Sequence, residues 1–431
     1  MRPGPARRGG GLLRHGLLRH RDFRLLWIGE TVSGTGTAMA AVGVPLLAVT
    51  VLHASTMAVA ALTAAAYLPW LVIGLPAGAW ADRLPVRPLM ITCDVLSALL
   101  YASLPVAAWL GVLTVFQVVA VAVLAGAVNV LFATAYQVLL PGLVGASGLV
   151  EGNAKLQGSA QVASVAGRST AGLAAEALGA ATALLVNAAS FAVSAACLLC
   201  IRARVTPAPD PGDPAPGRTT VREEITAGAR FIAADPYLRP LTLFGAAANL
   251  GYTGSTALLV VFLIRVAGFG PAAAGLLLGA SSVGGVLGAA AVRRLAGRLG
   301  TARALLLSVP GGTFSLLIPL AGPGPRVLCY LAGAAVPSGA IAIVNVIAGS
   351  FRQSYCPPGM LGRVTAGMRF LSFGAIPLGA LLAGSLATAL GTRDALWIIL
   401  AGYALSGTLL FSPAILARRD LPVRDLLTPV S

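Results

Sequence analysis

Four ionisable side chains lie within long apolar stretches of this 431-residue chain: Glu30, Asp94, Arg168 and Glu176. A charged group inside a hydrocarbon layer is costly, so such residues are rare and usually serve a function. Glu30 lies about two turns into its stretch, which at 1.5 Å per residue is roughly 10 Å deep. A carboxyl group at that depth can take up and release a proton. Glu30, Asp94 and Glu176 are therefore the candidates for proton coupling.

Each of the three acids also has a plainer structural interpretation. Glu30 could form a salt bridge with an arginine at the rim of the bilayer, and Glu176 could simply face water at the outer end of its helix. Asp94 could pair with Arg83, Arg87 or a residue of another helix and hold a gate shut, and for Asp94 we favour this role over proton carriage.

Arg168 lies twelve residues into its stretch, roughly 18 Å deep and near the midplane. Because arginine does not readily lose its charge, it needs a carboxylate, backbone carbonyls or an anionic ligand. We expect it to line a substrate cavity, where it binds substrate or pairs with Glu30 or Glu176. Uncharged polar residues in other stretches are further cavity candidates, although for each of them a role in joining helices is the more frequent one; they are Asn129, Gln137, Asn249, Tyr252 and Asn345.

Composition places these residues in a membrane protein. The chain is 57% hydrophobic and only 10% charged, with a mean hydropathy of +0.87, whereas a soluble domain has about 25% charged residues. The three histidines are too scattered for a metal site, and Cys197 and Cys200 lie in an apolar run, where thiols behave as small hydrophobes. We expect no metal, no cofactor, no disulfide and no enzymatic activity.

Twelve stretches are long enough to cross a bilayer, which takes about 20 apolar residues. An even number of spans puts both chain ends on the same side of the membrane. The predicted fold class is thus an all-α membrane protein with twelve transmembrane helices, at about residues 24–50, 57–80, 89–110, 114–139, 156–179, 181–202, 238–264, 272–293, 302–320, 326–350, 364–390 and 394–416.

The positive charges indicate how the helices are oriented. Of the 30 Lys and Arg residues, Arg168 is within a span and only Arg265, Arg326 and Arg393 fall in loops opposite the termini. The other 26 lie on the side of the termini, and such an excess marks the cytoplasmic side. This distribution explains the net charge of +16 without a nucleic-acid partner, because the chain has no basic helix or aromatic-interleaved patch for one.

The chain divides into two similar halves. Residues 1–21 are a basic cytoplasmic tail, 22–203 a first six-helix bundle, 204–235 a proline-rich linker with an amphipathic helix, 236–416 a second six-helix bundle and 417–431 a second tail. Gly74 and Gly285 lie 211 positions apart, and Gly172 and Gly384 lie 212 apart. The near-constant offset predicts an internal repeat, in which Arg293 replaces Asp82.

A short charged turn joins the second and third stretches, with Gly74, Gly78, Asp82, Arg83 and Arg87 at a recognisable spacing. Gly78, Asp82, Arg83 and Arg87 match the signature loop G-x-x-x-D-R-x-x-R-[RK] of the major facilitator superfamily, and Pro88 departs from its last basic position. The resemblance implies a fold of two six-helix bundles, with this loop stabilising the cytoplasmic gate.

Several stretches over about residues 21–416 resemble one branch of that superfamily, the bacterial exporters related to macrolide-efflux and enterobactin-export proteins. Among them are Arg21-Asp22-Phe23-Arg24-Leu25-Leu26-Trp27 and Asp235-Pro236-Tyr237-Leu238-Arg239. Within span five, Gly167-Arg168-Ser169-Thr170-Ala171-Gly172 keeps the outer glycines of a Gly-Pro-x-x-Gly-Gly-like exporter motif. Arg168 stands where the proline would be, so the motif by itself does not establish drug–proton exchange.

The resemblance implies a secondary transporter that exports a small, mostly apolar compound, such as a drug, an antibiotic or a siderophore-like molecule, by alternating access. Because no G-x-x-x-x-G-K-[ST] loop for ATP is present, we expect proton antiport. We also expect a monomer in the plasma (inner) membrane of a bacterium, whose partners are lipid, protons and a small-molecule substrate. The alternatives are an uptake permease for a small metabolite and a non-transporting membrane receptor or intramembrane enzyme.

Overall fold

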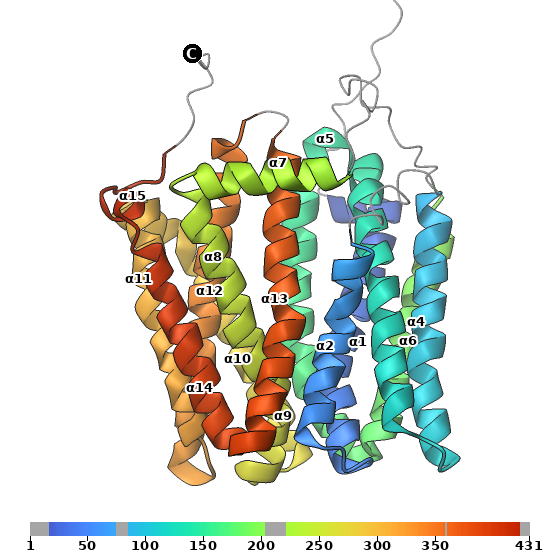
Figure 1. Ribbon diagram of the computed structural model, residues 1–431. Coiled ribbons are helices and arrows are strands. Elements are labelled where there is room, and N and C mark those ends of the chain that lie inside the picture. Colours follow the sequence, from blue (N-terminus) through green and yellow to red (C-terminus); the bar gives the residue numbers. More distant parts are fainter. Residues whose placement is uncertain (1–16, 75–84, 203–220, 358–359, 423–431) are drawn as a thin grey trace, which may run out of the picture.

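In the computed structural model, residues 17–74, 85–202, 221–357 and 360–422 are described. Within these ranges all regular secondary structure is helical. Three residues of the signature loop, Gly78, Asp82 and Arg83, lie outside the described residues. We call the end of the bundle where α1 begins the inner end, and the end where α1 finishes, at Thr50, the outer end (Figure 1).

The first half of the chain forms a group of long helices that run between the two ends (Figure 1). Gly145 has φ +66° inside α5, a conformation that favours glycine, and it separates two helices that follow each other without a loop. The elements of this half are η1 (Leu17–Arg19), α1 (Arg21–Thr50), α2 (Thr56–Val72), α4 (Val86–Trp109), α5 (Val115–Leu178) and α6 (Ala180–Cys200).

The second half is a similar group, with two π-helical turns, η2 and η3, in its first span. The elements are α7 (Val221–Ala234), α8 (Leu238–Ala248), η2 (Asn249–Thr253), α9 (Gly254–Val261), η3 (Phe262–Val266), α10 (Pro271–Leu299), α11 (Thr301–Thr313), η4 (Phe314–Leu320), η5 (Gly324–Arg326), α12 (Val327–Tyr355), α13 (Leu361–Leu390), α14 (Thr392–Ser406), η6 (Gly407–Leu410) and α15 (Pro413–Leu416).

A helix lies at each of the twelve predicted span positions. Nine helices of the described residues are long and apolar enough to cross a membrane, and Thr56–Val72 is a shorter apolar helix. The remaining two positions are filled by the second part of α5, which carries four charged residues, and by α14. The prediction of an all-α membrane protein is confirmed.

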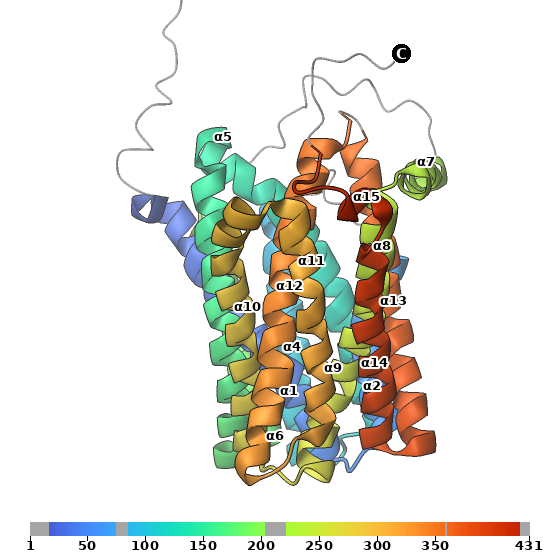
Figure 2. The same cartoon turned by 90° about the vertical axis from the view of Figure 1, so that its left-hand side faces the viewer.

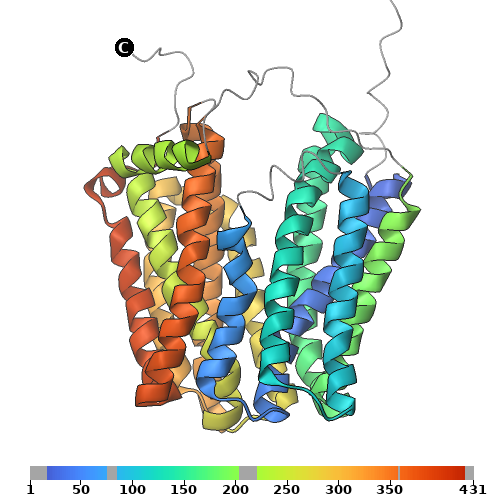
Figure 3. The same cartoon turned by 45° about the vertical axis from the view of Figure 1, so that its right-hand side comes forward.

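The two halves form separate bundles that meet along two helix pairs. Figure 3 shows most of the blue-to-green helices on one side and the yellow-to-red ones on the other, with the blue α2 beside the orange-red α13. In the first bundle α1 packs against α5 and α6, and in the second α10 packs against α12. Between the bundles, α5 packs against α10 and α2 against α13. The amphipathic helix α7 lies across the inner end beside α13 (Figures 1 and 2).

The outer and inner ends are packed differently. Towards the outer end, one buried apolar cluster takes residues from both halves, such as Leu47 and Val59 from the first and Phe262 and Leu396 from the second. Towards the inner end each half has its own cluster, one around Phe23 and Met90 and the other around Leu238 and Phe351. The bundles are therefore held together at the outer end and have separate cores at the inner end.

Candidate functional site

Two carboxyl groups, one partly and one fully buried, lie within electrostatic reach of each other inside the first bundle. Glu30 comes from α1 and Asp94 from α4, and each has one buried oxygen with no hydrogen-bond partner among the described residues. Asp94 is only 1% exposed. Tyr136 of α5 is the next ionisable neighbour of Glu30. Two like charges cannot easily coexist at a buried site, so the pair is suited to hold a proton.

Of the partners predicted for Asp94, Arg87 is wrong, Arg83 lies outside the described residues, and the structure places a residue of another helix there. Arg87 does not reach Asp94, because its Nε donates to the Leu198 carbonyl at 2.8 Å and its Nη2 to the Leu199 carbonyl at 2.6 Å. Those carbonyls lie near the end of α6, where unpaired acceptors attract a cation. Asp94 instead lies within hydrogen-bonding reach of the Ser194 hydroxyl, also on α6.

Arg168 is fixed by its backbone at the junction of three helices. The neighbouring Gly167 packs so closely on α1 that a Cβ there would lie 2.7 Å from the Cβ of Ala38. On the other side of the helix, the carbonyl of Arg168 lies 3.1 Å from the Cβ position of Gly275 on α10. The two outer glycines of the predicted motif thus serve different contacts, Gly167 towards α1 and Gly172 towards α10.

The predicted pairing of Arg168 with Glu30 or Glu176 is wrong in this conformation. The half-buried guanidinium group has no ion pair and no hydrogen bond within the described part of the chain. Its ionisable neighbours are Tyr67 of α2 and Tyr330 of α12, both within electrostatic reach. The Tyr330 hydroxyl is fully buried and also lacks a partner among the described residues.

Glu176 lies at the outer end, where it joins the two bundles. Its Oε2 accepts a hydrogen bond of 2.9 Å from the backbone N–H of Ala272, in the first turn of α10. A carboxylate is favourable there because a helix N-terminus carries unpaired N–H groups and a partial positive charge. The side chain itself is exposed to solvent at the outer end. This position fits the second of its two predicted roles, that of a residue facing water at the end of its helix.

Arg265 is a second outer contact, which the sequence analysis counted only as a loop charge. Its Nη2 donates to the carbonyls of Ala54 at 2.8 Å and Val49 at 3.3 Å. Arg265 belongs to the second bundle, whereas Val49 and Ala54 flank the end of α1 in the first. No sequence motif marks this residue, and its partners are backbone atoms that only the fold brings close.

The uncharged polar candidates divide into two groups. Asn249 donates to the carbonyl of Ser372 on α13 at 3.2 Å, and the hydroxyls of Tyr252 and Ser338 on α12 lie 3.0 Å apart, so these two side chains join helices. Three others are exposed and have no hydrogen-bond partner in the described residues: Asn129, Gln137 and Asn345.

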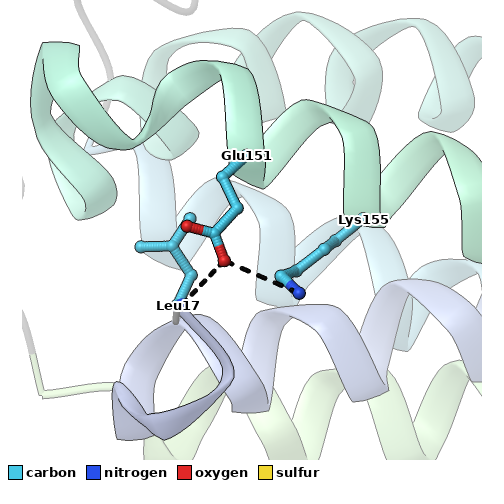
Figure 4. A network of polar contacts seen from close by, with 3 residues as sticks. All are labelled: Leu17, Glu151 and Lys155. Carbon is cyan, nitrogen blue, oxygen red and sulfur yellow. Dashed lines mark hydrogen bonds and ion pairs between the residues drawn. The ribbon is translucent and has the colours of Figure 1, made fainter. Parts of the chain in front are cut away.

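The repeat-related positions at the inner end do not both lie in loops. Gly74 follows the end of α2, and its repeat partner Gly285 lies in mid-helix. Arg293, the counterpart of Asp82, lies on an exposed turn of α10 rather than in a loop, because that helix continues to Leu299. The one ion pair of the described residues is Lys155 with Glu151, at 3.6 Å, and Glu151 also accepts from the backbone N–H of Leu17 at 3.0 Å (Figure 4).

Comparison with known proteins identifies the family. Residues 15–426, nearly the whole chain, match the profile of the transmembrane secretion effectors, a family of the major facilitator superfamily. The chain belongs to this family. As a transmembrane secretion effector it is a multi-pass secondary transporter of small molecules and not an enzyme, and the resemblance expected from the signature loop is confirmed.

A relative of the family is the multidrug efflux pump Tap of Mycolicibacterium fortuitum, which is 30% identical over 383 residues, covering 85% of this chain and 89% of Tap. Two solved structures share the fold at low identity. The nucleoside transporter NupG has a TM-score of 0.72 at 15% identity, and the match covers 92% of this chain and 98% of NupG. A bacterial homologue of the iron transporter ferroportin, in an inward-facing state, has a TM-score of 0.70 at 18% identity, and the match covers 92% and 98% of the two chains.

Because the chain belongs to a transporter family, its geometry can be compared with what transport requires. A secondary transporter exposes a central site to each side in turn, and here the outer end of the secretion effector is closed while the inner cores are separate. The buried carboxyl pair lies within one bundle, and Arg168 lies at the boundary between the bundles.

Proposed function

We propose that this secretion effector exports small, mostly apolar compounds from a bacterial cell in exchange for protons. The carboxyl pair of Glu30 and Asp94 is the observation that carries the proposal. Two acids in a bundle that spans the bilayer, with no cationic partner among the described residues, are costly unless at least one is protonated. Protonation and release at this pair give each transport cycle a coupling step.

Export as the direction is supported by the 30% identity to a multidrug efflux pump over most of both chains. The structural neighbours include a nucleoside transporter, but their identities below 20% bear on the fold alone. The proposal includes an inner-membrane location with both termini in the cytoplasm, in line with the excess of arginine at the inner end, and a monomer as the working unit.

The test uses purified protein in proteoliposomes and separates coupling from transport. Glu30→Gln keeps the size of the side chain but cannot release a proton. We expect this variant to lose accumulation of a substrate dye against its gradient, while exchange of labelled for unlabelled dye at equal concentration continues. Asp94→Asn is expected to lose most of the accumulation too, since it removes the other member of the pair.

Asp394→Asn is the matched control, because Asp394 is an exposed carboxylate in the first turn of α14. Its accumulation should equal that of the unmodified protein and should collapse on addition of a protonophore. Accumulation by Glu30→Gln at the full rate, or accumulation that survives the protonophore, would refute proton coupling at this pair.

A further inference from the structure

The strongest unexplained feature of the molecule is the uncompensated charge of Arg168. A half-buried guanidinium group normally has a carboxylate or several carbonyls around it, because its five N–H donors must otherwise give up water. Here it has neither an ion pair nor a hydrogen bond within the described residues. The acids expected to neutralise it do not do so: Glu30 and Asp94 form no ion pair among the described residues, and Glu176 accepts from the N–H of Ala272.

The position of Arg168 is set by close backbone packing and does not depend on its side chain. Gly167 is held on α1, and Gly172 faces Gly275 of α10 so closely that a Cβ at Gly172 would lie 2.7 Å from the Cα of Gly275. The arginine between these glycines therefore lies at the boundary of the two bundles. Tight helix contacts on both sides hold its backbone in place while leaving its charge unpaired.

The field of this charge reaches two tyrosines from different bundles. Tyr67 comes from α2 and Tyr330 from α12, and both lie within electrostatic reach of Arg168. The hydroxyl of Tyr330 is completely buried and has no partner among the described residues, although a buried hydroxyl nearly always has one. The site thus has hydrogen-bond donors and a positive charge, and no carboxylate of the described residues pairs with that charge.

We propose that Arg168, Tyr67 and Tyr330 form a subsite for the carboxylate of the exported compound, so that the substrates are apolar molecules carrying a carboxylate. This rests on the proposed export function and names its substrate class. The guanidinium group binds a carboxylate through two parallel N–H···O bonds, and the tyrosine hydroxyls can donate to the remaining lone pairs. A cation without an acidic group would be repelled by Arg168.

Because the three residues come from both bundles, a bound carboxylate would bridge them. It would neutralise Arg168 and satisfy the Tyr330 hydroxyl at the same time, which removes two unfavourable buried groups. Binding would therefore be coupled to the relative position of the bundles, as an alternating-access cycle requires.

The experiment measures binding without any gradient, so its outcome is independent of proton coupling. Purified protein in nanodiscs of neutral phosphatidylcholine is titrated against rhodamine 110, which carries a free carboxylate, and against its methyl ester, rhodamine 123, with fluorescence polarisation as the readout. We expect the acid to bind at least about tenfold tighter than the ester. Arg168→Gln should weaken binding of the acid about tenfold and should leave binding of the cationic ester unchanged or tighter, because the repelling charge is gone.

Arg168→Lys keeps a charge but loses the planar fork, and we expect about a threefold loss for the acid alone. This conservative variant also guards against a folding defect, and each protein is checked by gel filtration. Arg326→Gln is the matched control, because Arg326 is an exposed arginine at the outer end, and it should bind both dyes unchanged.

Equal binding of the acid by Arg168→Gln and the unmodified protein, or no binding of the acid at all, would overturn the subsite. So would displacement of the acid when anionic phosphatidylglycerol replaces part of the neutral lipid, since that result assigns Arg168 to a lipid phosphate. In each case a proton-driven accumulation that still depends on Glu30 would leave the export function intact.

Discussion

The outer and inner ends of this transporter are built from the same helices but joined in different ways. At the outer end one apolar cluster spans both bundles, and Glu176 and Arg265 add polar contacts between them. At the inner end each bundle keeps its own core. The difference shows that the conformation is closed on the outside, and that its closure rests on the shared apolar cluster, on the helix pairs α5–α10 and α2–α13 and on a few hydrogen bonds. These contacts must break when the outer end opens.

The largest expected effect comes from filling the seam between α5 and α10. A Cβ at Gly172 would meet the backbone of Pro271 and Gly275, and backbone cannot move aside as a side chain can. We expect Gly172→Ala to cost the closed outer end about 1–3 kcal/mol, a shift of about five- to a hundredfold towards outer opening. The measurement is the distance, by double electron–electron resonance, between spin labels at Val51 and Leu390, two exposed outer positions of different bundles.

Gly158→Ala is the control for that variant. Gly158 lies on the same helix towards the inner end, and a Cβ there would have no neighbour within 4 Å. Its label distances should match those of the parent protein. If both glycine variants leave the outer distance unchanged, the seam does not hold the outer end closed.

A smaller effect is expected from Arg265→Gln. The arginine joins the bundles through the carbonyls of Val49 and Ala54, but it is exposed, so water replaces part of what is lost. We expect a cost of about 1 kcal/mol to the closed end, which is roughly a fivefold shift in the same label distances. Arg326→Gln, which removes an outer arginine without such contacts, should have no effect; an equal shift in both variants would mean that outer charge in general is responsible.

The smallest effect is expected from Glu176→Gln. The amide can still accept from the N–H of Ala272, and only the negative charge at the N-terminus of α10 is lost, which is worth about 0.3–1 kcal/mol. The populations of outer-open and outer-closed protein should shift by about two- to fivefold, and the shift should vanish in high salt because exposed charges are screened. A change as large as that of Gly172→Ala would mean that the Glu176 carboxylate, and not the packing of α5 on α10, holds the outer end closed.

Much of the fold could be predicted because the lengths of the apolar stretches can be read directly from the sequence. All twelve span positions coincide with helices, and the halves expected from the hydrophobic pattern are two bundles. The π-helical turns η2 and η3 and the helix pair fused at Gly145 were not predicted. They depend on local backbone hydrogen bonding, which apolar composition does not encode.

The residues of the candidate site were selected from the sequence one by one, but their neighbours were not predicted. Glu30, Asp94 and Arg168 were selected because charge within an apolar run is rare, and that criterion needs no structure. Their neighbours could not be derived, since the partner of each lies on a helix far away in the chain. Arg87 pairs with carbonyls of α6 instead of Asp94, and Arg168 has no acid at all among the described residues. Arg265 was missed because its partners are backbone atoms.

Alternating access requires that the inner end closes when the outer end opens. Measuring one distance at each end tests this directly. A second label pair at Gln157 and Gly297, exposed inner positions of α5 and α10, is measured beside the outer pair in lipid. We predict that Gly172→Ala lengthens the outer distance and shortens the inner one in the same population of molecules. An outer distance that lengthens while the inner distance stays fixed, or both lengthening together, would contradict alternating access in this protein.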